Sequence, residues 1–438
     1  MPEHNETVAA APRTAFESVT DGYIAFLLSV FLLAVPRAGY ENITAFKYVL
    51  FLGSFALYAA LLLFFAVRGR VRGEALKRPA ADAVSLLLLA FLLFSAVSAL
   101  LSEYGGTFLG NGRREGLLTV AVYVFSCLLV SRLARPARWM LYLFGASVTA
   151  FCVLSLLQFT GLNPLGLFPD GMTYLDAGTL YSGEYFGFVG NAGLSVAVLS
   201  LAAGIFAMAL IKLPGKARLL LAVPLLLSVL VILKSGVSAG AVALGGGVLL
   251  SLPCLPGREK KTARRILFIT VPAVIILALL LLMLLPVGGS GTLYEASALL
   301  HGDIHDTFGS GRIYIWRSCL RLFAEKPLFG GGPDTLGLRG IAPFMRWDAA
   351  RGMIKRGIDA AHNEYLNILV NQGIFAIAAY LAALVIAAVR WYRTASPAAA
   401  IAGTGVLFYC IQAFFGISSC VSAPLFWLAL GLFLRAER

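Results

Sequence analysis

Long apolar segments alternate with short polar ones along most of this chain. Crossing the hydrocarbon of a bilayer takes roughly 20 mostly apolar residues in a helix, because every backbone polar group must be satisfied within the segment. Twelve stretches meet this requirement: 21–38, 43–67, 83–101, 115–131, 139–159, 191–211, 219–234, 236–253, 266–286, 365–389, 397–415 and 417–434. The pattern therefore predicts an all-α integral membrane protein with about 12 transmembrane helices.

The spacing of these stretches predicts three regions. Residues 1–286 form an N-terminal transmembrane region with helices 1–9, and residues 365–438 form a C-terminal one with helices 10–12. Between them, residues 287–364 form a large loop, called the long loop below, which we expect to be partly helical and extracytoplasmic. A Pro- and Gly-rich stretch at 327–340 divides this loop in two.

One part of the long loop has the pattern of an amphipathic helix. Over residues 312–324, Ile313, Trp316, Leu320 and Phe323 recur on one helical face, with arginines on another. This pattern predicts a helix that lies at the membrane surface.

The distribution of basic residues predicts the orientation of the chain. The first 22 residues are polar and lack a basic segment followed by a cleavage site, so we expect no removable signal peptide. If the N-terminus is inside, the inside segments hold 21 Lys and Arg residues, and the short outside segments hold 5: Arg37, Lys47, Arg113, Arg114 and Lys234. Because cytoplasmic loops carry the excess of Lys and Arg, this split predicts that both termini lie in the cytoplasm.

Composition agrees with a membrane protein. The chain is 59% hydrophobic and 13% charged, against about 45–50% and 25% in soluble domains. Its net charge of +13 comes from basic clusters between apolar runs, which topology explains without a nucleic-acid partner. The six cysteines are scattered singly with no CxxC pair, which argues against a disulfide framework or a zinc site.

Polar motifs gather in the long loop and before two helices. The loop contains Ser310-Gly311-Arg312 with Ile315-Trp316, Gly330-Gly331-Gly332-Pro333-Asp334-Thr335, and His362-Asn363 with Tyr365-Leu366. Upstream lie Gly110-Asn111-Gly112-Arg113-Arg114-Glu115-Gly116 and Gly190-Asn191-Ala192-Gly193. Arginine presents planar pairs of donors that suit a diphosphate, and an imidazole has the unperturbed pKa nearest to neutrality, as a general base requires. The loop has no DxD pair, so we expect no magnesium clamp.

With these segments the chain resembles the O-antigen ligase and O-antigen polymerase superfamily. The resemblance implies transfer of a glycan from an undecaprenyl-pyrophosphate donor to an acceptor hydroxyl at the outer face of the cytoplasmic membrane, without a metal or a cofactor. It does not distinguish ligase from polymerase, nor identify the sugar or whether the acceptor is a lipid, a glycan or another polymer.

Site residues are carried over motif by motif. The resemblance implies that His362 is catalytic, that Arg312 is the best match for binding the donor pyrophosphate, and that Arg113 or Arg114 is a weaker one. Other loop arginines are candidates by charge alone: Arg339, Arg346, Arg351 and Arg356. Supporting roles are expected for Asn363, Asn191 and Asp334. The family often has Gly-Asn-Pro-Asn where this chain has Gly-Asn-Ala-Gly at 190–193, so no role carried by the second Asn is expected here.

Several residues also have a simpler interpretation. A lone His before a transmembrane helix is often a capping residue, and Arg317 with Arg321 suits a solvated or headgroup-facing helix side. The glycines at 330–332 suit a turn, since no strand precedes them. His301 and His305 have no third ligand nearby and are read as loop residues.

Two other functions remain open from the sequence. A secondary transporter or a lipid-linked oligosaccharide flippase also fits a dozen helices, but such proteins tend to have two related halves and interrupted helices. We see no half-symmetry and expect no ionisable residues deep in the helices. A peptidoglycan polymerase, whose site depends on an outer-loop aspartate, would use Asp334.

Overall fold

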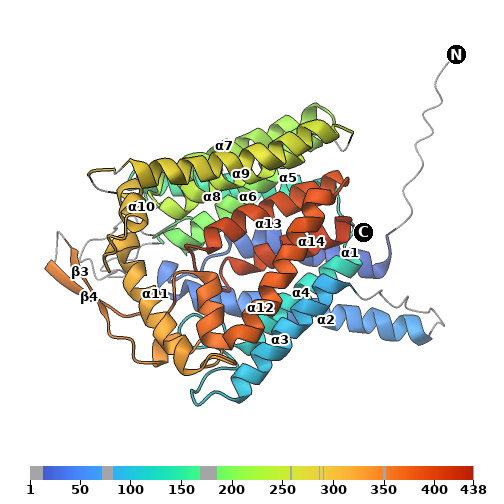
Figure 1. Ribbon diagram of the computed structural model, residues 1–438. Helices are drawn as coiled ribbons and strands as arrows, with labels where there is room; N and C mark the ends of the chain where they lie inside the picture. Colours follow the sequence, from blue (N-terminus) through green and yellow to red (C-terminus); the bar gives the residue numbers. More distant parts are fainter. Residues whose placement is uncertain are drawn as a thin grey trace.

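The fold is known from a computed structural model that describes residues 13–71, 82–167, 185–256, 259–285, 287–289, 291–348 and 352–437. The described chain is mainly α-helical, and its two small sheets have two strands each. Figure 1 shows the helices as one bundle, with the elements of the long loop gathered at one end.

Each of the twelve predicted apolar runs overlaps a helix. These are α1 (Ala15–Phe26), α2 (Ile43–Val71), α3 (Ala83–Leu100), α4 (Leu117–Leu133), α5 (Arg138–Phe159), α6 (Ala192–Lys212), α7 (Ala222–Lys234), α8 (Ser238–Ser251), α9 (Lys261–Leu284), α12 (Glu364–Arg393), α13 (Pro397–Ala413) and α14 (Ala423–Glu437). Among the described residues, seven helices are long and apolar enough to cross a membrane, and three more are apolar but shorter. The all-α membrane class is therefore confirmed, and the number of twelve crossings stays a prediction.

The observed helix boundaries differ most from the predicted ones where polar residues form the ends of the helices. At the first run, α1 begins at Ala15 because Thr14 and Glu17 form a capping box, and a π-helical turn, η1 (Leu27–Phe31), continues it. The last helix was predicted to begin at 417 but begins at Ala423, after a turn in which the Ala423 N–H donates to the Ser419 carbonyl oxygen over 2.9 Å. Apolar composition locates a helix but does not identify its caps.

Lys47 is a buried charged residue near the start of α2. We counted it in a short outside segment, but it lies in α2, within the predicted run 43–67, and is fully buried. Its ammonium group donates to the carbonyl oxygens of Phe31 and Leu32, where the π-helical turn ends, and lies 5.0 Å from the centre of the Phe31 ring. The lysine therefore supplies donors to carbonyls at a helix end inside the bundle.

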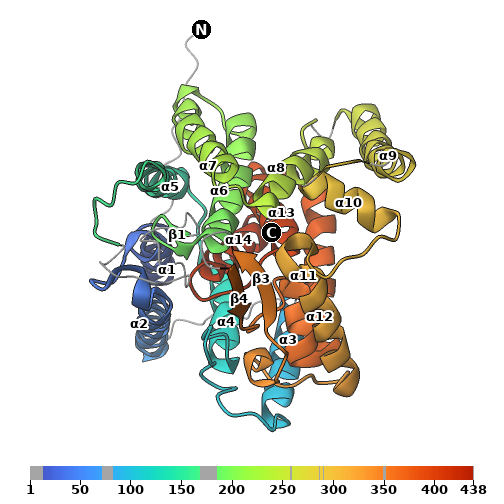
Figure 2. The same cartoon turned by 90° about the vertical axis from the view of Figure 1, so that its left-hand side faces the viewer.

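The core of the bundle is built around α6 and α13. Most of the apolar window of α6 is buried, whereas almost none of that of α9 is, and Figure 2 shows α9 at the edge of the bundle. Glycines permit the close contact of α6 with α13, since a Cβ at Gly204 would lie 2.7 Å from the Thr404 carbonyl oxygen and one at Gly405 would lie 2.9 Å from that of Leu201. Small residues at such crossings are typical of membrane helices.

The tenth predicted helix is interrupted, which its apolar pattern did not indicate. Within α12, Gly373 has φ +83° and ψ −179°, so the helix breaks there. The loop at 327–332 fills the break: the Gly332 N–H donates to the Asn371 carbonyl oxygen (2.7 Å) and the Ile374 N–H to that of Pro327 (2.9 Å). Backbone groups freed by the break are thus satisfied inside the protein.

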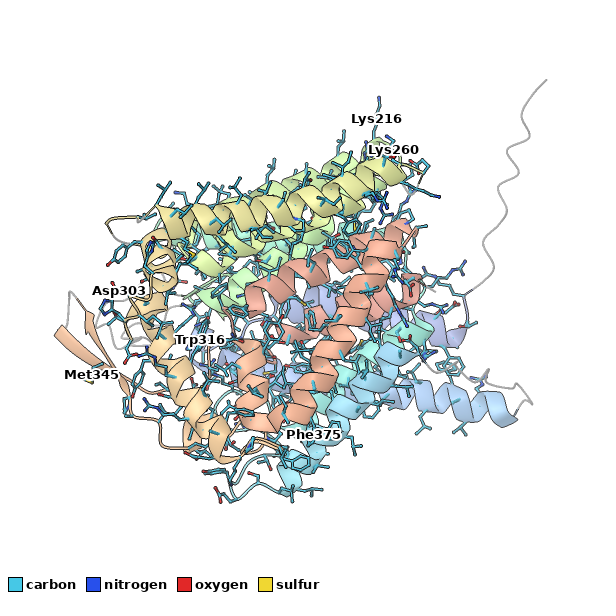
Figure 3. The ribbon with its side chains drawn as sticks, in the orientation of Figure 1. Lys216, Lys260, Asp303, Trp316, Met345 and Phe375 are labelled. Carbon is cyan, nitrogen blue, oxygen red and sulfur yellow. The ribbon has the colours of Figure 1, made fainter. Side chains whose placement is uncertain are left out.

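The long loop is partly helical, as predicted. It contains α10 (Thr292–Leu300), α11 (Phe308–Glu325), a 3₁₀ turn, η5 (Leu336–Leu338), and a hairpin of β3 (Phe344–Asp348) and β4 (Gly352–Arg356) that was not predicted. A second short pair, β1 (Tyr185–Phe186) with β2 (Gly190–Asn191), precedes α6. In Figure 3, Asp303, Trp316 and Met345 of the loop lie at the opposite end of the molecule from Lys216 and Lys260.

The apolar face of α11 matches the predicted one only in part: Trp316 and Phe323 pack against the buried cluster as expected, but other residues form its centre. Ile315 and Cys319 are buried and pack with Val370 of α12, whereas Leu320 is 52% exposed. The helix therefore packs against the first part of α12, a partner that the periodicity of residues 312–324 could not specify.

Candidate functional site

Arg312 follows a sharp turn of the backbone at the start of α11. Gly309, Ser310 and Gly311 all have left-handed φ angles, +61°, +60° and +89°. The Arg312 guanidinium donates through Nη1 to the Gly309 carbonyl oxygen (2.7 Å) and through Nη2 to that of Phe415 (3.1 Å). Its Nε is buried and has no hydrogen-bond partner among the described residues. The side chain is held in place by two of its donors, and its buried Nε–H remains unused.

Asp334 connects the turn at 330–335 to the upstream motif at 110–116. Its carboxylate accepts from the backbone N–H groups of Asn111 (2.6 Å) and Glu115 (3.3 Å), and the Asn111 side-chain amide donates to the Asp334 carbonyl oxygen (2.8 Å). Burial raises the pKa of Asp334, and the two N–H donors oppose this rise. The carboxylate thus holds the segment that carries Arg113.

The two arginines of the upstream motif point to different partners. Arg113 forms an ion pair with Asp359, with 2.7 Å between Nη2 and Oδ1, and its Nε is buried without a hydrogen-bond partner in the described part of the chain. The Arg114 guanidinium lies 5.7 Å from the centre of the Tyr48 ring. Arg113 is therefore connected to the segment that precedes His362, and Arg114 is packed against α2.

His362 is held by contacts on both sides of its backbone. The Trp316 indole donates to the Ala361 carbonyl oxygen (2.9 Å), and the Ala361 N–H donates to the Asn367 side chain (3.2 Å). Immediately after His362, the Asn363 side chain caps α12 by accepting from a backbone N–H of its first turn. The tryptophan of one motif thus positions the histidine of another.

Charged residues of two other motifs affect the pKa of the His362 imidazole. The pKa of His362 is lowered to about 4, first by burial and then by the positive charges of Arg113 and Arg312, while Asp359 opposes the shift. Two arginines about 200 positions apart in the chain therefore act on one imidazole, which is neutral at pH 7.

The backbone provides an independent sign that these motifs form one site. Among the described residues, four that are not glycine have left-handed φ angles, and all lie in the quoted motifs: Arg114, Ser310, Asp334 and His362. Such conformations cost of order 1–3 kcal/mol each and tend to occur at active sites, where the surrounding structure enforces them.

Two residues were not assigned to the site around His362 from the sequence, although the structure places both in its network of contacts. Asp359 lies three positions before His362, with no motif to mark it. Glu115 is in the upstream motif, and its carboxylate accepts from the hydroxyls of Tyr123 (2.7 Å) and Ser418 (3.0 Å). Burial raises the pKa of Glu115 to about 8, against the lowering effect of these hydrogen bonds.

Two other candidate residues, Arg339 and Asn191, bind the ends of helical segments. Arg339 donates to the carbonyl oxygens of Val370 (2.8 Å) and Leu322 (2.8 Å), so it is committed to the ends of helical segments. Asn191 caps α6 by accepting from the N–H groups of Gly193 and Leu194.

The basic residues of the hairpin and helix α11 also differ in position from Arg312. Arg346 lies in β3 opposite Ile354, Arg356 lies in β4, and Arg351 falls outside the described residues. Arg317 pairs with Asp306 over 2.8 Å, and both side chains are half exposed, as expected for a solvated helix side. In the part of the chain that the structure describes, no group of three or more His, Cys, Asp or Glu side chains is arranged to hold a metal ion.

The fold and the site define a polytopic α-helical membrane protein with a histidine and two arginines gathered at the end of the bundle that carries the long loop. Residues 223–381 match the family model described as O-antigen ligase, a range that contains Arg312, Asp334 and His362. A search of curated proteins gave no match. The family match agrees with the resemblance seen in the motifs of the long loop.

Proposed function

We propose that this protein transfers or polymerises a glycan from an undecaprenyl-pyrophosphate donor onto an acceptor hydroxyl at the outer face of the cytoplasmic membrane. The observation that carries the proposal is that two contacts connect the arginine motifs to the segment of His362: Arg113 pairs with Asp359 over 2.7 Å, and Trp316 of α11 donates to the Ala361 carbonyl oxygen over 2.9 Å. The charges of Arg113 and Arg312 also lower the pKa of His362. Arg113 and Arg312 would bind the diphosphate, and His362 would act on the acceptor.

The proposed reaction is a direct displacement at the anomeric carbon. His362 accepts the proton of the acceptor hydroxyl as its oxygen forms a bond to that carbon, and the bond from the carbon to the diphosphate oxygen breaks on the opposite side. The electron pair leaves with undecaprenyl pyrophosphate, whose charge the arginines stabilise. Attack from the side opposite to the leaving group inverts the anomeric configuration.

Arginine supplies the positive charge that a metal ion supplies in many transfers of this kind. The unused Nε donors of Arg113 and Arg312 suit additional diphosphate oxygens, since guanidinium groups bind such anions in pairs of hydrogen bonds. We therefore propose that the reaction needs no metal ion.

The arrangement of charges along the bundle supports the proposed orientation. The site lies at the end that carries the long loop, whereas Lys216 and Lys260, from segments counted as inside, lie at the other end together with the C-terminus. We propose that the long loop is extracytoplasmic and that residues 1–286 and 365–438 form the two membrane regions, with both termini in the cytoplasm.

The break in α12 does not favour the alternative of a transporter. Interrupted helices in transporters leave backbone groups free to bind an ion or a substrate. Here the loop at 327–332 occupies the break, and the Gly332 and Ile374 N–H groups donate to backbone carbonyl oxygens across it.

Reconstitution tests the proposal directly. The purified protein is placed in liposomes with an undecaprenyl-pyrophosphate glycan and candidate acceptors, with and without EDTA, and transfer is followed by gel or mass spectrometry. We expect transfer in both conditions and its loss in His362→Ala and Arg312→Ala. His301→Ala and Arg317→Ala are matched controls from the same loop, since both residues have partners away from the site.

Each outcome decides a different part of the proposal. Transfer that survives His362→Ala and Arg312→Ala would remove the site assignment, and transfer lost in EDTA would remove the metal-free mechanism. Absence of transfer to any acceptor, with glycan movement across the bilayer instead, would favour a flippase.

A further inference from the structure

Two aspartates lie near Arg113, and their surroundings differ. The Asp334 carboxylate is bound by two backbone N–H groups and is largely enclosed. The Asp359 side chain is 52% exposed, and among the residues that the structure describes Arg113 is its one hydrogen-bond partner. Asp334 is thus a fixed part of the structure, whereas Asp359 can leave Arg113 and enter water without an unpaired charge being buried.

Arg113 itself has the features of an incompletely occupied anion site. Its guanidinium is 23% exposed, makes a single hydrogen bond to Asp359 and retains a buried Nε without a partner in the described chain. A carboxylate on a guanidinium is commonly bound through two parallel hydrogen bonds, so this pairing uses only part of what Arg113 offers. A diphosphate has more acceptor oxygens and more negative charge than a carboxylate.

We propose that Asp359 is a stand-in anion: its carboxylate occupies the Arg113 guanidinium in the donor-free protein and is displaced by the diphosphate of the donor. The proposal rests on the function proposed above. Asp359 holds the Arg113 guanidinium through one hydrogen bond and neutralises one of the two arginine charges while the site is empty. On binding, the diphosphate takes over this neutralisation, and Asp359 turns to solvent.

The exchange also affects which ligands the site accepts. A weakly charged or monodentate anion competes poorly with a carboxylate that is held on the same chain, whereas a diphosphate gains from several hydrogen bonds at once. Because Asp359 opposes the effect of the arginines on the pKa of His362, the site keeps an anion beside the imidazole in both states. Asp359 is therefore a specificity-determining residue for diphosphates.

Binding of inorganic pyrophosphate to the full-length protein in nanodiscs, measured by calorimetry, tests this role. Removing the competing carboxylate in Asp359→Asn is expected to tighten binding about two- to fivefold, the range for an exposed ion pair, with less effect at high salt. Asp306→Asn is the matched control, because Asp306 forms a similar half-exposed pair with Arg317 in the same loop and the charge change is identical. That control is expected to bind as the wild type does.

The experiment includes a second background, Arg113→Gln. In this background the added Asp359→Asn change is expected to have no effect, because the carboxylate no longer has a guanidinium to occupy. Asp359→Ser provides a second variant with the same expected direction, and thermal melting of each variant checks its fold.

The failure of this inference can be told apart from the failure of the proposed function. If Arg113→Gln weakens pyrophosphate binding but Asp359→Asn leaves it unchanged or weaker, the stand-in role is wrong and the donor role of Arg113 stands. If the wild type binds no pyrophosphate, or Arg113→Gln binds it equally well, both are wrong.

Discussion

The contact between α6 and α13 contrasts with the backbone around His362. At the helix contact, regular helices approach through glycines, and a Cβ at Gly204 would lie 2.7 Å from a carbonyl oxygen. Around His362 the chain instead uses left-handed residues, and its side chains bind backbone groups. In the first region side-chain volume decides stability, while in the second unfavourable backbone conformations and polar contacts place a few reactive groups.

The largest effect is expected from removing the imidazole while leaving its backbone intact. Asn tolerates a left-handed φ better than most residues, so His362→Asn is expected to keep the fold. Loss of a general base typically costs about 10²–10⁴-fold in rate. Transfer assays and thermal melting are measured together, and a melting temperature that falls along with activity would show that His362 is mainly structural.

A change at the break in α12 is expected to lower both stability and activity. A Cβ at Gly373 would lie 2.2 Å from the Leu328 carbonyl oxygen at a left-handed φ, and Gly373→Ala is expected to destabilise the protein by about 2 kcal/mol or more. We expect transfer to fall as well, because the first part of α12 follows His362 directly. Denaturation and transfer assays check this, and normal activity would separate the break from the site.

In the core, crowding is expected to affect stability without affecting chemistry. Gly204→Ala places a methyl group against the Thr404 carbonyl and the Phe408 ring, and overpacking of this kind costs about 1–3 kcal/mol. Gly53→Ala is the matched control, since a Cβ at this exposed position in α2 meets nothing within 4 Å. Unfolding free energy and activity per folded molecule are measured, and equal stability of the two variants would contradict the packing argument.

The smallest effect concerns the pH dependence of transfer. A general base works when it is neutral, so activity falls as the pH drops through its pKa, and a pKa of about 4 places this fall well below that of an ordinary histidine. Arg113→Gln removes a positive charge near His362, so its pKa rises and the fall moves to higher pH. Profiles of kcat/KM against pH for both proteins test this, and an unchanged profile would mean that Arg113 does not act on His362.

The sequence was sufficient to locate the helices, and it named the residues that we propose as the centre of the site. Every apolar run overlaps a helix, because the length and composition needed to cross hydrocarbon are local properties of a segment. Arg312, Arg113 and His362 were likewise named from their motifs, and the structure brings the three together through the charges that act on one imidazole.

Other features depended on contacts between distant segments. The break in α12 requires the loop at 327–332, the buried face of α11 requires α12, and the pairing of Asp359 with Arg113 joins residues that are far apart in the chain. The place of Asp334 was similarly open, because a carboxylate in a turn can face solvent, a metal ion or backbone N–H groups. Hydrophobicity acts residue by residue and is visible in the order of amino acids, whereas hydrogen bonds and ion pairs between separate segments exist only once the chain has folded.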